Sequence, residues 1–198
     1  MLNDNKLLSM TRNSLLNAAI TLSKVAKTIF ILLIIGFTAI FIHLQLDRSF
    51  YNSKKIKINT NLEGYLYSMK WKSDTNAEYT EIFTLDKLKT VSLYITYSKL
   101  LGVLVLMFFC VLEFQRVMQS VRDVKTFRKN NVQSFRRIGQ LLIGCAILTS
   151  YTAFRFENGG FKGVSIPFTT LFLILFAFIM AEIFKEGVLM KEENDLTI

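Results

Sequence analysis

Four long apolar runs constrain this chain more than any other feature of its sequence. Three of them carry no charged residue, namely residues 28–46, 138–154 and 163–181, and the fourth, residues 90–112, carries only Lys99. A helix needs about 20 mostly apolar residues to cross a hydrocarbon core of about 30 Å. Each run reaches or approaches that length, so we expect an all-α integral membrane protein with four transmembrane helices in a bundle.

A water-soluble bundle of four buried helices is the alternative for such a sequence. Each helix of a soluble bundle needs a polar stripe that faces water. Residues 171–181, LFLILFAFIMA, are apolar on every face, and a chain of 198 residues cannot build a core that buries four helices of this kind. The sequence therefore favours lipid around these helices.

Basic residues near the ends of the spans predict their orientation. Residues 113–137, which we call the basic hinge, hold seven Lys or Arg and two acidic residues, whereas residues 47–89 hold eight basic and six acidic residues. Cytoplasmic loops carry the excess of Lys and Arg, so we expect a multi-pass protein of the cell inner membrane with both termini in the cytoplasm. The expected segments, in chain order, are an interfacial segment 1–24, a first span 25–46, an external loop 47–89, a second span 90–112, the cytoplasmic basic hinge 113–137, a third span 138–156, an external turn 157–163, a fourth span 164–184 and a cytoplasmic acidic tail 185–198.

The external loop has strand-like patterning. Apolar and polar residues alternate over residues 55–60 and again around Tyr65 and Tyr67, as they do in short half-buried strands. Turn-forming residues occur at 63–64 and 73–76. We therefore expect a small extracytoplasmic β-like cap between the first and second spans.

Two helix faces are expected to pack against neighbouring helices of the same protein. Gly139 and Gly144 lie on a small-residue face of the third span, where another helix can approach closely. The second span is expected to continue as helix into the basic hinge, because its apolar residues keep a three-four spacing there. These residues are Phe114, Val117, Val121 and Val124.

Several function classes lack support in the sequence. The net charge of +9 does not by itself indicate nucleic-acid binding, since much of the charge flanks the spans and no nucleic-acid-binding motif accompanies it. We see no catalytic acid–base pair, nucleophile triad, phosphate-binding glycine loop or metal-ligand spacing. We therefore expect a non-enzymatic protein with no catalytic, cofactor-binding or metal-binding residues, and no direct contact with nucleic acid.

Four residues inside or beside the apolar runs need their own interpretation. Cys110 and Cys145 are expected to be reduced, buried packing residues. His43, the only histidine, is expected to form an interfacial hydrogen bond. Lys99 is an intramembrane polar residue with two open interpretations: its ammonium group reaches the outer interface by snorkelling, or it makes a buried contact with an ion or substrate.

The basic hinge and the acidic tail are expected to lie on the same side of the membrane and to dock against each other. Glu182, the second intramembrane polar candidate, is expected at the inner end of the fourth span. In the competing interpretation, the hinge faces anionic lipid. The candidate interaction residues are Arg128, Lys129, Arg136 and Arg137 of the hinge and Glu186, Glu193 and Asp195 of the tail.

Two stretches, TFRKNNVQSFRRIGQLLI at residues 126–143 and EIFKEGVLMKEENDLTI at residues 182–198, resemble the two recognisable blocks of the domain of unknown function 2975 family. The first departs from the family pattern, because Thr126-Phe127 reverses the usual order and Phe135 replaces a leucine. The resemblance implies a small four-span bacterial membrane protein without an assigned activity. The second stretch fits closely at Phe184, Gly187, Met190, Glu193, Asp195, Leu196, Thr197 and Ile198.

Two function hypotheses follow. Genes of the family often lie next to genes for small helix-turn-helix regulators, so the resemblance implies such a regulator as a cytoplasmic partner. We expect a regulatory, sensory or partner-tethering protein that acts through the hinge and the tail, with the lipid bilayer, this regulator and a second copy of the chain as candidate partners. The alternative is a small transporter or channel component, or an immunity-type protein that protects the membrane.

Overall fold

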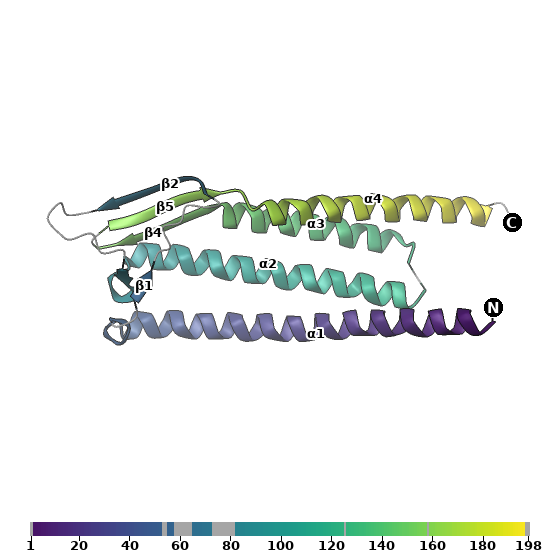
Figure 1. Ribbon diagram of the computed structural model, residues 1–198, viewed down its shortest axis with the longest axis horizontal. Coiled ribbons are helices and arrows are strands. Elements are labelled where there is room, and N and C mark those ends of the chain that lie inside the picture. Colours follow the sequence, from purple (N-terminus) through teal and green to yellow (C-terminus); the bar gives the residue numbers. More distant parts are fainter. Residues whose placement is uncertain are drawn as a thin grey trace. The chain divides into compact units, whose positions relative to one another are not determined.

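The computed structural model describes residues 2–52, 55–57, 65–72, 82–124, 126–157 and 159–196 (Figure 1). The chain forms two compact units, which we call the helical unit and the sheet unit. The helical unit contains Met1–Ile31, Val105–Gly144 and Thr169–Ile198, and the sheet unit contains Leu32–Leu104 and Cys145–Phe168. The elements, in chain order, are α1 (Leu2–Leu46), η1 (Ser49–Tyr51), β1 (Lys55–Lys57), β2 (Tyr65–Lys72), β3 (Ile82–Thr84), η2 (Leu85–Lys87), α2 (Thr90–Arg122), α3 (Lys129–Ser150), β4 (Tyr151–Phe156), β5 (Gly159–Ser165) and α4 (Phe168–Leu196).

Three helices are long and apolar enough to cross a membrane in the part of the chain that the structure describes. They are Ser14–Leu46 within α1, the whole of α2 and the whole of α4. The 33 residues of α2 extend about 50 Å at helical rise, which exceeds the hydrocarbon thickness of about 30 Å. The prediction that helix continues from the second span into the basic hinge is therefore confirmed.

Two segments that were separated from the spans only because they carry charged residues are helical as well. They are the interfacial segment and the acidic tail. Helix α1 is unbroken from Leu2 to Leu46, so the described part of the interfacial segment, residues 2–24, and the first expected span form one element. Helix α4 likewise runs to Leu196, so the acidic tail is helical through most of its length. The fourth span was expected to begin at residue 164, but residues Gly159–Ser165 form β5 and the helix begins at Phe168.

The prediction that residues 138–156 are helical throughout is wrong from Tyr151 onward. Helix α3 ends at Ser150, and Tyr151–Phe156 form β4. The uncharged part of α3 after Arg137 is about 13 residues, or about 20 Å, which is too short to cross a bilayer as helix alone. A fourth transmembrane helix is therefore not among the helices that meet the length and hydropathy requirements in the described part of the chain.

A three-stranded antiparallel sheet organises the sheet unit, with β5 between β2 and β4 (Figure 1). Most of β5 is formed by residues that were expected to form an external turn, 157–163, and Phe156 of β4 pairs with Gly159 of β5. A second antiparallel pair joins β1 to β3. The β-like cap is thus present as a small antiparallel sheet, but β4 and β5 from beyond α3 complete it. The turns expected at 63–64 and 73–76 lie outside the described residues.

Each unit has its own apolar core. In the sheet unit, Leu44, Leu88, Leu93 and Phe156 are buried together. In the helical unit, the expected seam of α2 packs through Val117, which is fully buried, and through Val121, whereas Phe114 and Val124 are exposed. The small-residue face of α3 also makes close contacts, with Gly139 against Phe178 and Gly144 against Leu106. The core of the helical unit consists of Val117, Val132, Phe135, Ala181, Phe184 and Val188.

Candidate functional site

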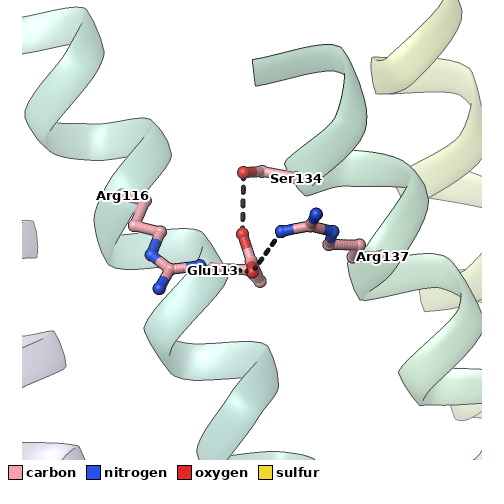
Figure 2. A network of polar contacts seen from close by, with 4 residues as sticks. All are labelled: Glu113, Arg116, Ser134 and Arg137. Carbon is pink, nitrogen blue, oxygen red and sulfur yellow. Dashed lines mark hydrogen bonds and ion pairs between the residues drawn. The ribbon is translucent and has the colours of Figure 1, made fainter. Parts of the chain in front are cut away.

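A buried carboxylate lies where α2 and α3 pack together in the helical unit. Glu113 of α2 accepts a hydrogen bond from the Ser134 hydroxyl of α3, with 2.7 Å between Oγ and Oε2. Its other oxygen, Oε1, lies 2.7 Å from Nη1 of Arg116 and 3.3 Å from Nη1 of Arg137. Figure 2 shows the two guanidinium groups reaching this oxygen from opposite sides, one from each helix. Both carboxylate oxygens are therefore satisfied, which a buried charge requires.

Glu113 was not among the site residues expected from the sequence. It entered the prediction only as one of two acidic residues in the basic hinge. The signal was nevertheless present, because Glu113 directly follows the uncharged run 100–112 of α2. A single carboxylate at the end of an apolar run needs a partner, and the hinge arginines are the nearest cations along the chain.

The connection between α2 and α3 is held by one buried amide. Asn131, in the first turn of α3, donates from Nδ2 to the Thr126 carbonyl at 2.6 Å and to the Ser120 hydroxyl at 2.9 Å. These bonds join the end of α2, the connection and the start of α3. The connection is therefore a specific hydrogen-bonded structure.

The acidic tail packs on this connection through apolar contacts. The ring of Phe127 lies directly over Gly187 of α4, so that a Cβ atom at position 187 would overlap the ring. Phe184, one helical turn before Gly187, packs against Phe135 of α3 with 5.0 Å between the ring centroids. The hinge and tail therefore meet through a core contact.

Ion pairs surround this apolar contact. Lys129 of the hinge lies 3.0 Å from Glu192 of the tail, and Arg136 lies 3.6 Å from Glu182. Glu182 also pairs with Lys185, one turn further along α4. All of these side chains are substantially exposed, so solvent screens the pairs and each contributes little to the stability of the fold.

A pocket of about 380 Å³ opens between the connection and the end of α4. This volume falls within the range of small-ligand and anchor-residue pockets. Its lining combines two apolar side chains with charges of both signs. The lining residues are Phe127, Arg128, Lys129, Asn130, Val188, Lys191, Glu192 and Asp195.

Residues 72–198 match the family model described as "Protein of unknown function (DUF2975)". The chain belongs to the DUF2975 family. The matched part contains α2, α3, β4, β5 and α4 and hence every residue of the Glu113 cluster and of the pocket. No curated protein and no solved structure matches the chain.

The two stretches that resemble the DUF2975 family contact each other in the helical unit. Phe127 belongs to the first stretch and Gly187 to the second, and Phe135 and Phe184 are related in the same way. Although about 40 residues separate these stretches in sequence, they form one packed cluster. The reversed Thr126-Phe127 order still places a phenylalanine ring on Gly187.

The candidate interaction residues of this DUF2975 protein have different surroundings. Arg128 and Asp195 line the pocket, and Lys129 and Arg136 pair with tail residues as described above. Arg137 pairs with Glu113 and not with a tail carboxylate. Glu186 and Glu193 are exposed on α4, and Glu186 forms no ion pair with any residue that the structure describes.

Lys99 lies in the sheet unit, at the end of α3. Its ammonium group donates to the Tyr151 carbonyl and lies 3.5 Å from the Thr152 hydroxyl. The backbone changes there from helix to strand, so this carbonyl has no helical N–H donor to accept from. Lys99 therefore binds the first residue of β4, directly after α3, a role that neither sequence interpretation included.

The remaining singled-out residues have ordinary packing roles. Nδ1 of His43 lies 3.1 Å from the Tyr51 hydroxyl, which is a hydrogen bond as expected. Cys110 and Cys145 are both buried and are not joined in a disulfide, as predicted. No group of three or more metal-ligating side chains occurs among the described residues.

Proposed function

We propose that this protein is a non-enzymatic, multi-pass membrane protein that tethers a cytoplasmic protein partner through its basic hinge and acidic tail. The single observation that supports this function best is the pocket between the connection and the end of α4. It is built from the two segments that resemble the family blocks, and both segments contribute charged residues to its lining.

The pocket offers several groups that a partner can engage. Arg128, Lys191 and Asp195 line it without forming an ion pair with any described residue, whereas Lys129 and Glu192 pair with each other. Phe127 and Val188 are the apolar side chains among its lining residues. A partner with one apolar anchor, an acidic group and a basic group would therefore find complementary contacts, as in interfaces where a buried anchor is surrounded by polar residues.

The proposed orientation places both termini and the hinge in the cytoplasm. It rests on the excess of basic over acidic residues in the hinge. Cysteines introduced at residues 125 and 65 should then react with a membrane-impermeant maleimide from opposite sides of the membrane. Labelling of both positions from the same side would contradict this orientation.

A cytoplasmic helix-turn-helix regulator is the first partner to test, because the family resemblance implies one. We expect the full-length wild-type protein, purified from native membranes, to retain this regulator, and the double variant Arg128→Glu/Lys191→Glu to lose at least about tenfold of it. The control, which carries one of the two charge reversals, is Arg122→Glu, since Arg122 pairs with the neighbouring Asp123 and does not line the pocket.

Three outcomes decide the proposal. Equal retention by wild type and the pocket variant would show that the pocket does not bind the partner. Equal loss in the control would indicate an effect of net charge alone. Retention that is reduced only in the pocket variant, with wild-type circular dichroism, would support tethering through this pocket.

A further inference from the structure

Glu113 holds two arginines at one place on the surface of the helical unit. Nη1 of Arg116 and Nη1 of Arg137 contact the same carboxylate oxygen, Oε1. The carboxylate side chain is 8% exposed, whereas the two arginine side chains are 57% and 58% exposed. A buried anion therefore fixes the positions of two cations that remain accessible.

Most hydrogen-bond donors of these arginines remain available. A guanidinium group has five N–H donors in a planar fork. In the part of the chain that the structure describes, each of the two groups forms a hydrogen bond only with Glu113. The cluster of two cations and one anion keeps a net charge of +1, and its open donors suit an anion with several acceptor oxygens.

The arginine pair lies where apolar helix surface gives way to charge. Glu113 is the first charged residue of α2 after Lys99, and Arg137 is the last charged residue of α3 before its apolar part. Phe114, beside Glu113, is exposed, as is Phe109 in the preceding turn. Acceptor oxygens bound here would therefore have apolar protein surface beside them, as in a lipid whose phosphate lies at the interface.

We propose that Arg116 and Arg137, held by Glu113, form a binding site for the phosphate group of an anionic lipid such as phosphatidylglycerol. The guanidinium forks supply paired N–H donors to phosphate oxygens, and the exposed aromatic rings contact the acyl chains. This site is separate from the pocket proposed to bind a protein partner, and it takes a different class of ligand.

A substitution of Glu113 can distinguish two explanations of lipid binding. One is a specific site formed by the two arginines, and the other is diffuse attraction between basic residues and anionic lipid. Substituting Glu113 by glutamine raises the net charge by one, so diffuse attraction predicts stronger lipid binding. In a built site, the same substitution removes the group that positions both arginines, so binding weakens. The two explanations thus predict changes of opposite sign for one variant.

The experiment measures lipid retention by the full-length protein in detergent, using native mass spectrometry with equimolar phosphatidylglycerol and phosphatidylcholine. We expect wild type to favour phosphatidylglycerol. We expect Arg116→Gln/Arg137→Gln to lower that preference by about tenfold or more and Glu113→Gln to lower it too. Arg122→Gln is the matched control, which removes a basic residue near the end of α2 outside the cluster and should keep the preference within about twofold.

A second variant distinguishes loss of the lipid site from loss of the fold. Arg116→Lys/Arg137→Lys keeps both charges but removes the planar forks, so we expect it to fold and to lose most of the preference. Wild-type preference in this variant, or an increased preference in Glu113→Gln, would overturn the proposal. Competition by millimolar inorganic phosphate to the same extent as by lipid would instead identify free phosphate as the ligand and would equally overturn the lipid site.

Discussion

The helical unit and the sheet unit are stabilised in different ways. In the helical unit, side chains from three helices form one core around Val117, and each helix makes its own backbone hydrogen bonds. In the sheet unit, β2 is hydrogen-bonded to β5, which follows it by about 90 residues. The comparison shows that the elements of the helical unit are locally encoded, whereas the sheet depends on a distant pairing.

Close packing against glycine occurs in both units and allows a direct comparison. Gly160 of β5 lies under the ring of Trp71, and Gly187 of α4 lies under the ring of Phe127. Trp71 is the only tryptophan in the chain, so its fluorescence reports on the sheet unit alone. A methyl group added at Gly36 of α1 would meet no atom within 4 Å, so Gly36 is the matched control position.

The largest effect is expected for Gly160→Val. Its Cβ would lie 2.7 Å from the Phe154 carbonyl oxygen of the adjacent strand and would also overlap Trp71. Because a backbone atom cannot move away cheaply, we expect destabilisation by about 3 kcal/mol and a shift of the Trp71 emission maximum. Equilibrium unfolding followed by tryptophan fluorescence measures both, and Gly36→Ala should leave both unchanged. An unshifted emission maximum would contradict the packing of Trp71 on β5.

Gly187→Ala should have a smaller effect, confined to the helical unit. The added methyl group would meet the exposed ring of Phe127, which can turn aside at a cost of about 1–2 kcal/mol. We expect weaker disulfide crosslinking between cysteines placed at 129 and 192, with unchanged Trp71 emission. The second substitution Phe127→Ala should relieve the overlap and reduce the effect of Gly187→Ala. Additive effects of the two substitutions would contradict direct contact.

Lys99→Met tests the transition between helix and strand in the sheet unit. It removes the donor to the Tyr151 carbonyl, and we expect destabilisation by about 1 kcal/mol because that carbonyl loses a hydrogen bond. Thermal unfolding with Trp71 emission as the readout measures this loss. Lys99→Arg keeps a donor of similar reach and should retain most of the stability. Equal behaviour of the two variants would show that the hydrogen bond is not needed.

The smallest effect concerns pH and Asp47, which follows the end of α1. Hydrogen bonds from the Ser49 hydroxyl and the Phe50 backbone N–H lower the pKa of this carboxyl below its usual value. A lowered pKa in the folded state stabilises the fold above the unfolded-state pKa, and this contribution is lost as the pH falls through the folded-state pKa. The stability difference between wild type and Asp47→Asn should therefore shrink on acidification. A constant difference down to about pH 3 would contradict this.

Sequence patterns predicted the helical unit well because the spacing of apolar residues and the distribution of charge can be recognised within short stretches of the chain. The three-four spacing of Val117 and Val121 correctly indicated packing, and the opposite charges of hinge and tail indicated two segments that the structure brings together. Glu113 was missed because its partner Ser134 lies in another helix. No local pattern could indicate which hydroxyl would satisfy the second carboxylate oxygen.

The prediction failed at Tyr151–Phe156 for a physical reason. The stretch YTAFRF is short, mostly apolar and rich in residues that favour strands. Hydropathy alone therefore does not distinguish helix from strand in this stretch. Its ladder partner β5 follows directly in sequence, but further backbone partners of β4 lie more than 60 residues earlier, at the start of α2. The Arg155 carbonyl accepts from the Lys89 N–H at 2.9 Å, and the Arg155 N–H donates to the Ser92 hydroxyl at 3.0 Å.

The pairing of β2 with β5 also constrains the order of events during synthesis. A ribosome adds about 5–20 residues per second, so the strand Tyr65–Lys72 leaves the tunnel several seconds before Gly159–Ser165 exists to receive it. Throughout that interval its backbone groups must be hydrated, bound by a chaperone or paired elsewhere. Anything that delays delivery of the later strand, such as slow insertion of the intervening helices, prolongs the period in which the newborn chain is most exposed to aggregation and proteolysis.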